Sequence, residues 1–200
     1  MGFKVIAAMD LANVNEVLRH SFPSAPTEVD YRALRTWIKN DAAVQAGVSP
    51  SEIDLKAHAF KVKHVNEVED LITAHLEAEG WIVHADPSDE LPNQLGVVRQ
   101  FGNKKPLSDF IGDRLTHQKQ RAFYLIGNDF RHLPAQAERI LVSHQLPVTL
   151  VVIRSHYSYS PSNALRLAGS PIRVVFAEDI TGWLPEGGAS PAREYNCLTA

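Results

Sequence analysis

Cysteine is nearly absent from this chain, which has a single one, Cys197, among 200 residues. One cysteine cannot form an internal disulfide or supply the paired thiolates of a zinc finger, so nothing indicates an oxidising compartment. Long apolar runs are also missing, because no stretch approaches the roughly 18 residues of a membrane span. The apolar start is interrupted at Asp10, too early for a signal peptide. We therefore expect a soluble, cytoplasmic protein without a membrane partner.

An excess of one charge is absent as well. The chain has 20 Lys and Arg against 23 Asp and Glu, a formal net charge of −3. This balance argues against binding to nucleic acid through overall charge, although a local basic patch remains compatible with it. Several signatures are missing too: G-x-G-x-x-G, the P-loop, G-x-S-x-G and H-E-x-x-H. Without metal-ligand spacing, four histidines are interpreted as structural: His58, His64, His75 and His84.

What the chain does contain is an alternation of apolar runs with helical patterns. Strands are predicted at 5–9, 54–63, 81–85, 121–129, 148–155 and 173–179, and helices from about Asn13 and at 31–48, 67–80, 106–118, 134–145 and 162–169. This order predicts βαβ units, and hence a three-layer α/β/α, Rossmann-like fold with a mostly parallel sheet of about five to six strands. In two of the helices the predicted apolar faces include Val44 and Leu71. The domain should span 1–182, and 183–200, rich in Gly, Pro, Ser and Ala, should form a flexible tail.

Acidic and amide side chains occur at the ends of the predicted elements. Asp10 ends the first strand and Asn13 follows it; Asp109 and Asp113 lie four residues apart on one helix; the strand 123–126 runs through Gly127 into Asn128 and Asp129. Each group also has a structural explanation, namely a helix cap for Asp10, a solvated helix face for the second pair and an Asx turn for the third. The carboxyl ends of parallel strands meet at one edge of a sheet, however, where open α/β sheets bind ligands. Oxygen ligands gathered there would suit Mg²⁺ or Mn²⁺.

A basic segment surrounds the second acidic pair. Residues 99–121 contain six Lys or Arg, among them Lys104, Lys105 and Arg114, and Arg131 extends the series beyond the third group. Such a stripe attracts a phosphate backbone even when the net charge is negative. Surface Lys and Arg need no function, so the alternative of an ordinary solvated face stays open.

Four segments resemble a known family in their order and spacing. Asp10-Leu11-Ala12-Asn13 resembles the Asp-Gly-x-Asn signature that opens NYN domains, a branch of the PIN-like nuclease superfamily. LIGND at 125–129, followed by Pro134, resembles the family's strand and Ser-Gly-Asp-type turn, and KKPLSDFIGD at 104–113 falls where the family has a Lys-Gly-x-Asp helix. The closing segments, VTLVVIRS, SNALRLAG and a final strand, resemble its last βαβ unit. The resemblance covers residues 3–182.

The resemblance implies a metal-dependent ribonuclease, and single-stranded RNA is its expected substrate. Its metal ligands would be Asp10, Asp113 and Asp129, assisted by Asp109, and one or two Mg²⁺ or Mn²⁺ ions would activate water. Substrate contacts would come from two amides and four cations: Asn13, Asn128, Lys104, Lys105, Arg114 and Arg131.

The sequence departs from the family pattern at two acid positions, which Leu107 and Arg131 occupy. These departures keep open a second hypothesis, a non-catalytic PIN-like domain that binds RNA or a protein partner, including a second copy of itself. A third hypothesis, a small-molecule enzyme on a doubly wound sheet, lacks the dinucleotide and P-loop motifs. A haloacid dehalogenase-type phosphatase would require an Asp-x-Asp motif at the end of the first strand, and Ala12 occupies the position of the second Asp.

Overall fold

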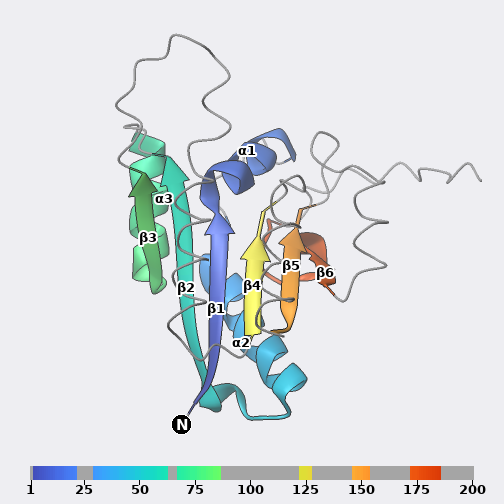
Figure 1. The fold of residues 1–200 in the computed structure, drawn as a ribbon. Helices are drawn as coiled ribbons and strands as arrows, with labels where there is room; N and C mark the ends of the chain where they lie inside the picture. The colour runs from blue at the N-terminus through green and yellow to red at the C-terminus, as the bar shows by residue number, and fades with distance from the viewer. Residues whose placement is uncertain are drawn as a thin grey trace, which may run out of the picture.

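All the strands of the sheet run in the same direction (Figure 1). The computed structural model describes residues 2–21, 29–62, 67–86, 122–127, 146–153 and 172–185. Within them, six parallel strands lie in the order β3-β2-β1-β4-β5-β6. The strands are β1 (Phe3–Asp10), β2 (Ile53–Val62), β3 (Trp81–Asp86), β4 (Ala122–Ile126), β5 (Val148–Val152) and β6 (Arg173–Phe176). The predicted α/β class with a parallel sheet is confirmed.

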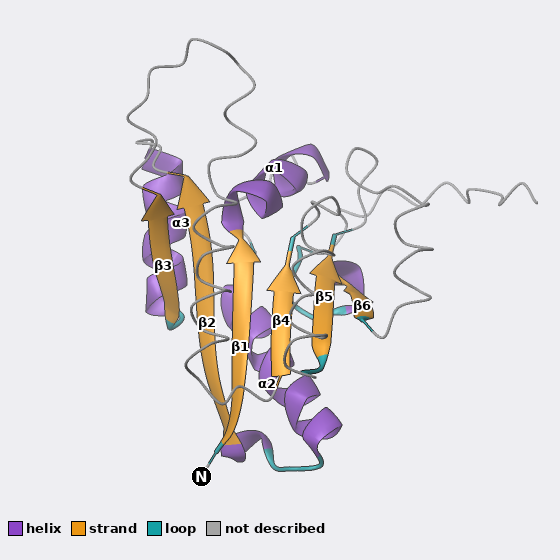
Figure 2. Cartoon of the chain, in the orientation of Figure 1, coloured by secondary structure: helices purple, strands orange, loops and turns teal. Residues whose placement is uncertain are grey.

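The described helices belong to the first half of the chain. They are α1 (Leu11–Ser21), α2 (Tyr31–Ala46) and α3 (Glu67–Ala78), and two short 3₁₀ turns accompany them, η1 (Pro50–Glu52) and η4 (Ala177–Asp179). Helices α2 and α3 lie on the same side of the sheet, whereas α1 lies over the carboxyl ends of the strands (Figure 2). Helix α1 begins at Leu11, directly after β1, two residues earlier than the sequence predicted. The helices predicted at 106–118, 134–145 and 162–169 fall outside the described residues.

Strand β1 is buried on both faces, as its continuous apolar run predicts. Val5, Ala7 and Met9 pack into the core beneath the three helices. Ile6 and Ala8 point the other way, into a second apolar cluster formed with residues of β2, β4 and β5. Both faces of the sheet therefore carry a core, which is the condition for the three-layer α/β/α class.

The ends of α2 are set by two caps. The Asp30 side chain accepts a hydrogen bond from the Ala33 backbone N–H at 2.9 Å, which satisfies one of the free N–H groups of the first turn. At the other end, Gly47 has φ 64° and its N–H bonds back to the helix, as in a left-handed C-terminal cap. The predicted apolar face was wrong at Val44, which is 82% exposed. The core is filled by Ala42 on the buried side of the same turn instead.

Leu71 in α3 is a similar correction, because it is 63% exposed while Ile72 and Leu76 are buried. At 100° per residue, Leu71 lies a quarter of a turn or more from the line that joins the two buried residues, so the helix presents a narrower face to the sheet than predicted.

A row of polar side chains on β4, β5 and β6 connects the sheet to α2. Tyr124, Thr149 and Arg173 are aligned in register across β4, β5 and β6. Asp41 of α2 accepts hydrogen bonds from the Tyr124 hydroxyl at 2.6 Å and from Gln45 Nε2 at 2.7 Å, and it forms an ion pair with Arg173. Burial, and then the hydrogen bond to Asp41, raises the pKa of Tyr124 far above its ordinary value. The phenol therefore stays protonated and donates to the carboxylate.

The chain remains part of the core beyond residue 182. Trp183, which the sequence placed at the start of the flexible tail, is fully buried among residues of the α2 side. Its carbonyl accepts a hydrogen bond from the Asp30 backbone N–H at 3.0 Å. The domain thus includes Trp183 and Leu184, which packs against the same core, while residues 186–200 lie outside the described chain.

The strand order reverses between β1 and β4. The chain leaves β1 towards β2 on one side, and leaves β4 towards β5 on the other. Open α/β sheets bind their ligands at such a switch point, in the crevice outside the carboxyl ends of the strands. A ligand-binding site is therefore expected at the carboxyl ends of β1 and β4.

Candidate functional site

Asp10 is the last residue of the central strand β1 and lies at the switch point. It is aligned with Phe60 of β2, and the preceding residue, Met9, is aligned with Ile126 of β4. Its side chain is only 5% exposed, which is unusual for a carboxylate. Burying a charged group is costly without compensation, so such a residue indicates either a structural hydrogen-bond role or a ligand.

One compensating contact is visible. The Oδ1 atom of Asp10 accepts a hydrogen bond from the Asn13 backbone N–H at 3.1 Å. This is an N-terminal cap on α1, and the positive end of the helix dipole adds a favourable interaction with the carboxylate. A carboxylate has about four acceptor positions, so this bond is compatible with further ligands on the same group. The capping role predicted as an alternative for Asp10 is confirmed, and it does not exclude a metal.

Gly127 continues the edge on the neighbouring strand. It follows Ile126 directly and has φ 155°, a backbone conformation that L side chains rarely adopt. Its N–H donates to the Val151 carbonyl at 3.0 Å, so the ladder between β4 and β5 extends through it. Because Met9 lies opposite Ile126, Gly127 is level with Asp10. The chain therefore leaves β4 beside Asp10, and Asn128 and Asp129 are the next residues of the sequence.

Two of the predicted site residues lie within the described chain, Asp10 and Asn13. Asn13 is half-buried in the first turn of α1, where its backbone N–H makes the capping bond. The others fall outside the described residues: Asp109, Asp113, Asn128, Asp129, Lys104, Lys105, Arg114 and Arg131. Among the residues that the structure does describe, no three His, Cys, Asp or Glu side chains are grouped as a metal site. The convergence of the acids thus stays a prediction.

Asn15 is a polar residue near this edge that no sequence motif indicated. It is 7% exposed, and its Oδ1 has no hydrogen-bond partner within the described residues. A buried amide without a partner is uncommon and calls for an explanation such as a water, ion or ligand. The available signal was its position: it lies four residues after Leu11 and three before Leu18, on the apolar face of α1.

Two of the histidines that were predicted to be structural, His58 and His84, lie beside the same edge. Phe60, aligned with Asp10, is also aligned with His84 of β3, so the three residues form one row across neighbouring strands. The Phe60 and His84 rings stack at a centroid distance of 4.7 Å. His58 Nδ1 lies 3.0 Å from His84 Nε2, and these rings stack as well, at 5.3 Å. Two strand spacings place His84 about 10 Å from Asp10 along the row. On the β2–β3 side, the row level with Asp10 is therefore occupied by aromatic rings.

These features define an α/β domain with a parallel sheet, in which a buried carboxylate lies where the strand order reverses. No protein-family model matches the sequence, and no curated protein is similar enough to count as a relative. Across the stretches of chain that the structure describes, none of the helices has the length and apolar character needed to cross a membrane.

Proposed function

We propose that this protein is a metal-dependent ribonuclease that hydrolyses phosphodiester bonds of single-stranded RNA, of the PIN-like type that its NYN resemblance suggests. The observation that carries the proposal is Asp10, a buried carboxylate at the carboxyl end of the central strand and at the reversal of strand order. The cytoplasm is the compartment we propose for it, because a chain with a single cysteine has no pair of thiols for the internal disulfide that an oxidising compartment favours.

The proposed metal ligands are Asp10, Asp113 and Asp129, with Asp109 assisting. A bound Mg²⁺ or Mn²⁺ would supply an acidified water and charge stabilisation at the phosphate. The donor chemistry of Asp10 fits such an ion, since carboxylate oxygens are the ligands that both metals favour. The capping bond from Asn13 fixes the carboxylate in place, as a hydrogen bond to a ligating group commonly does.

The proposed substrate contacts come from the amides of Asn13 and Asn128 and from four basic residues, namely Lys104, Lys105, Arg114 and Arg131. Basic side chains neutralise backbone phosphates without reading the base. We therefore expect RNA binding that weakens steeply with salt and depends little on sequence.

The test compares wild-type protein with Asp10→Asn on a 5′-labelled single-stranded oligoribonucleotide in Mn²⁺, with EDTA as the metal-free control. We expect cleavage by the wild type and its loss, by about a hundredfold or more, when the charge of a metal ligand is removed. Asp54→Asn is the matched control, because Asp54 is exposed at the start of β2, at the opposite edge of the sheet. Unchanged cleavage by folded Asp10→Asn would refute the assignment.

A second function is favoured by one structural observation. Asp10 already has a structural partner in the Asn13 N–H, so capping offers an explanation for its burial that needs no metal. Together with Leu107 and Arg131 at acid positions, this supports a PIN-like domain that binds RNA or a protein partner without cleaving. In that case RNA binding survives EDTA and Asp10→Asn, and no product ladder forms in any metal.

A further inference from the structure

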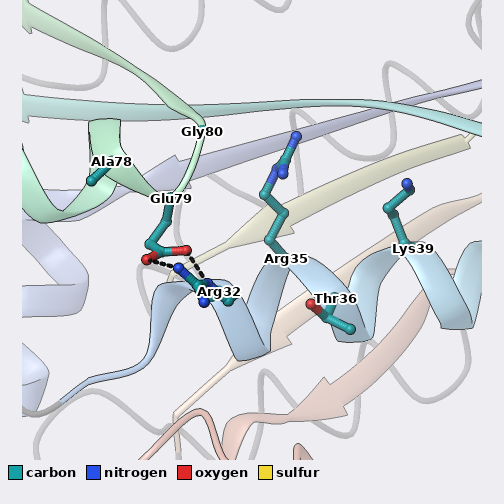
Figure 3. A pocket seen from close by; sticks show the side chains of 7 residues that line it. All are labelled: Arg32, Arg35, Thr36, Lys39, Ala78, Glu79 and Gly80. Carbon is teal, nitrogen blue, oxygen red and sulfur yellow. Dashed lines mark hydrogen bonds and ion pairs between the residues drawn. The ribbon is translucent and has the colours of Figure 1, made fainter.

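A hollow lies away from the switch point, between α2 and the turn that joins α3 to β3. Its volume is about 350 Å³, within the range of sites for small ligands. Seven residues line it: Arg32, Arg35, Thr36, Lys39, Ala78, Glu79 and Gly80 (Figure 3). It belongs to the helical side of the sheet, whereas Asp10 lies at the carboxyl edge of the strands.

The hollow is rich in positive charge. Arg32, Arg35 and Lys39 follow one another at intervals of three and four residues along α2, so their side chains share one face of the helix. Like charges at these spacings repel, which disfavours the arrangement unless an anion lies among them. Three cations against the single carboxylate of Glu79 leave a local excess of two positive charges in a chain whose net charge is −3.

Glu79 neutralises only one of the three cations. Its carboxylate binds the Arg32 guanidinium through two contacts, Nε to Oε2 at 2.5 Å and Nη2 to Oε1 at 2.9 Å. This hydrogen-bonded pair lowers the pKa of Glu79, so the carboxylate stays ionised. Arg35 and Lys39 extend from α2 in a different direction from Arg32 (Figure 3). Within the described residues, neither has an ion-pair partner.

Arg35 is partly buried, and its guanidinium lies close to Gly80. Its Nε is buried and has no hydrogen-bond partner in the part of the chain that the structure describes. A Cβ atom added at Gly80 would lie 3.3 Å from the Arg35 Cζ and Nη1 atoms, so the absence of a side chain there leaves room for the guanidinium. A guanidinium without a carboxylate partner is suited to bidentate binding of a phosphate.

We propose that the hollow between α2 and the α3–β3 turn is a phosphate-binding site, in which Arg35 and Lys39 hold the phosphate group. A single phosphate is much smaller than the hollow, which leaves space for the molecule that carries it. The phosphate belongs either to a small phosphorylated ligand or to a nucleic-acid backbone, because the same side chains recognise both. The site does not depend on the ribonuclease proposal, since it shares no residue with that site.

Inorganic pyrophosphate, titrated calorimetrically into the full chain at low salt in the presence of EDTA, tests the site. We expect saturable binding that Arg35→Gln weakens by about tenfold or more, through loss of a charge-assisted hydrogen bond. Lys39→Gln should also weaken it, and Arg35→Lys should retain part of it because the charge remains. Glu79→Gln should act in the opposite direction and tighten binding severalfold, because it releases Arg32 from its competing carboxylate.

Lys56→Gln is the matched control, because Lys56 is an exposed cation of β2 that lies outside the hollow. The affinity of this variant for pyrophosphate should stay within about twofold of the wild-type value. Circular dichroism confirms that each variant is folded. A twelve-nucleotide oligouridylate is titrated in parallel. Arg35-dependent binding of pyrophosphate identifies a small ligand as the source, and Arg35-dependent binding of the oligonucleotide alone identifies a nucleic-acid backbone. If neither probe binds, or if Arg35→Gln changes neither, the proposal is overturned.

Discussion

The two roles assigned to Asp10, helix capping and metal binding, can be separated by choosing the replacement. Asn and Asp are about equally good N-terminal caps, so Asp10→Asn keeps the bond to the Asn13 N–H and removes only the charge. We expect it to change the free energy of unfolding in EDTA by no more than about 0.5 kcal/mol. Asp10→Ala removes the cap as well and should lower that free energy by about 1–2 kcal/mol.

Bound metal should stabilise the wild-type protein but not the two Asp10 variants. A ligand that binds only the folded state at ten times its Kd stabilises it by about 1.4 kcal/mol. For a chain of 200 residues, this corresponds to a rise in Tm of about 3–6 °C. Asp10→Asn and Asp10→Ala should show little of this rise, because each has lost the charged ligand.

Thermal unfolding followed by circular dichroism, with EDTA and with increasing Mn²⁺, measures both effects on the same samples. Asp54→Asn should respond to Mn²⁺ as the wild type does. An equal rise in Tm for Asp10→Asn and the wild type would remove Asp10 from the metal site. A loss of stability in EDTA as large for Asn as for Ala would show that capping does not explain the burial of this side chain.

The remaining predictions concern the anchor between α2 and the sheet and the buried tyrosines. Tyr124→Phe should lower the free energy of unfolding by about 1–2 kcal/mol, because Asp41 loses a hydrogen-bond donor. Asp41→Ala should lower it by about 3 kcal/mol, because it leaves the buried Tyr124 hydroxyl without its acceptor and also removes the bonds to Gln45 and Arg173. In urea unfolding, the double variant should fall short of the sum by about 1 kcal/mol or more, and additivity would contradict a direct bond. Burial raises the pKa of both Tyr31 and Tyr124 above the ordinary value. The contribution of these two tyrosines to the free energy of unfolding is therefore fully present below about pH 10. It is lost as the pH rises further, because the same tyrosines ionise at a lower pH in the unfolded chain than in the folded one. Absorbance at 295 nm measures tyrosine ionisation and circular dichroism measures the fold, and together they should show that Tyr31 and Tyr124 ionise only when the protein unfolds. Ionisation of all five tyrosines near pH 10 with the fold intact would contradict this prediction.

Much of the fold could be predicted because its signals are local. The apolar run from Val5 to Met9 has no polar interruption, which indicates a strand buried on both faces, and both faces are indeed packed. The spacing of Leu34 and Ile38 identified α2, although Val44 was assigned wrongly to its buried face. That error arose because a helical pattern gives the period of the apolar face but not its width, which depends on the neighbouring elements.

The candidate site was predictable only in part. The position of Asp10 at a strand exit followed from the end of an apolar run, and so did its capping alternative. Asn15 was not found, because its burial depends on how α1 packs rather than on the sequence around it. Trp183 lay in a segment with the composition of a tail, yet its ring is buried on the α2 side of the core.

The sequence by itself determined where the six strands and the helices of the described residues lie, and that Asp10 ends the first strand, since both depend on neighbours within a few residues. Only the tertiary structure decided what lies beside what. The row of Asp10, Phe60 and His84 requires the register of three strands, and the cationic hollow requires α2 to meet the turn at Gly80, more than forty positions further along the chain. Contacts of this kind arise when burial of apolar faces brings distant segments together, and the local pattern of residues does not encode their partner.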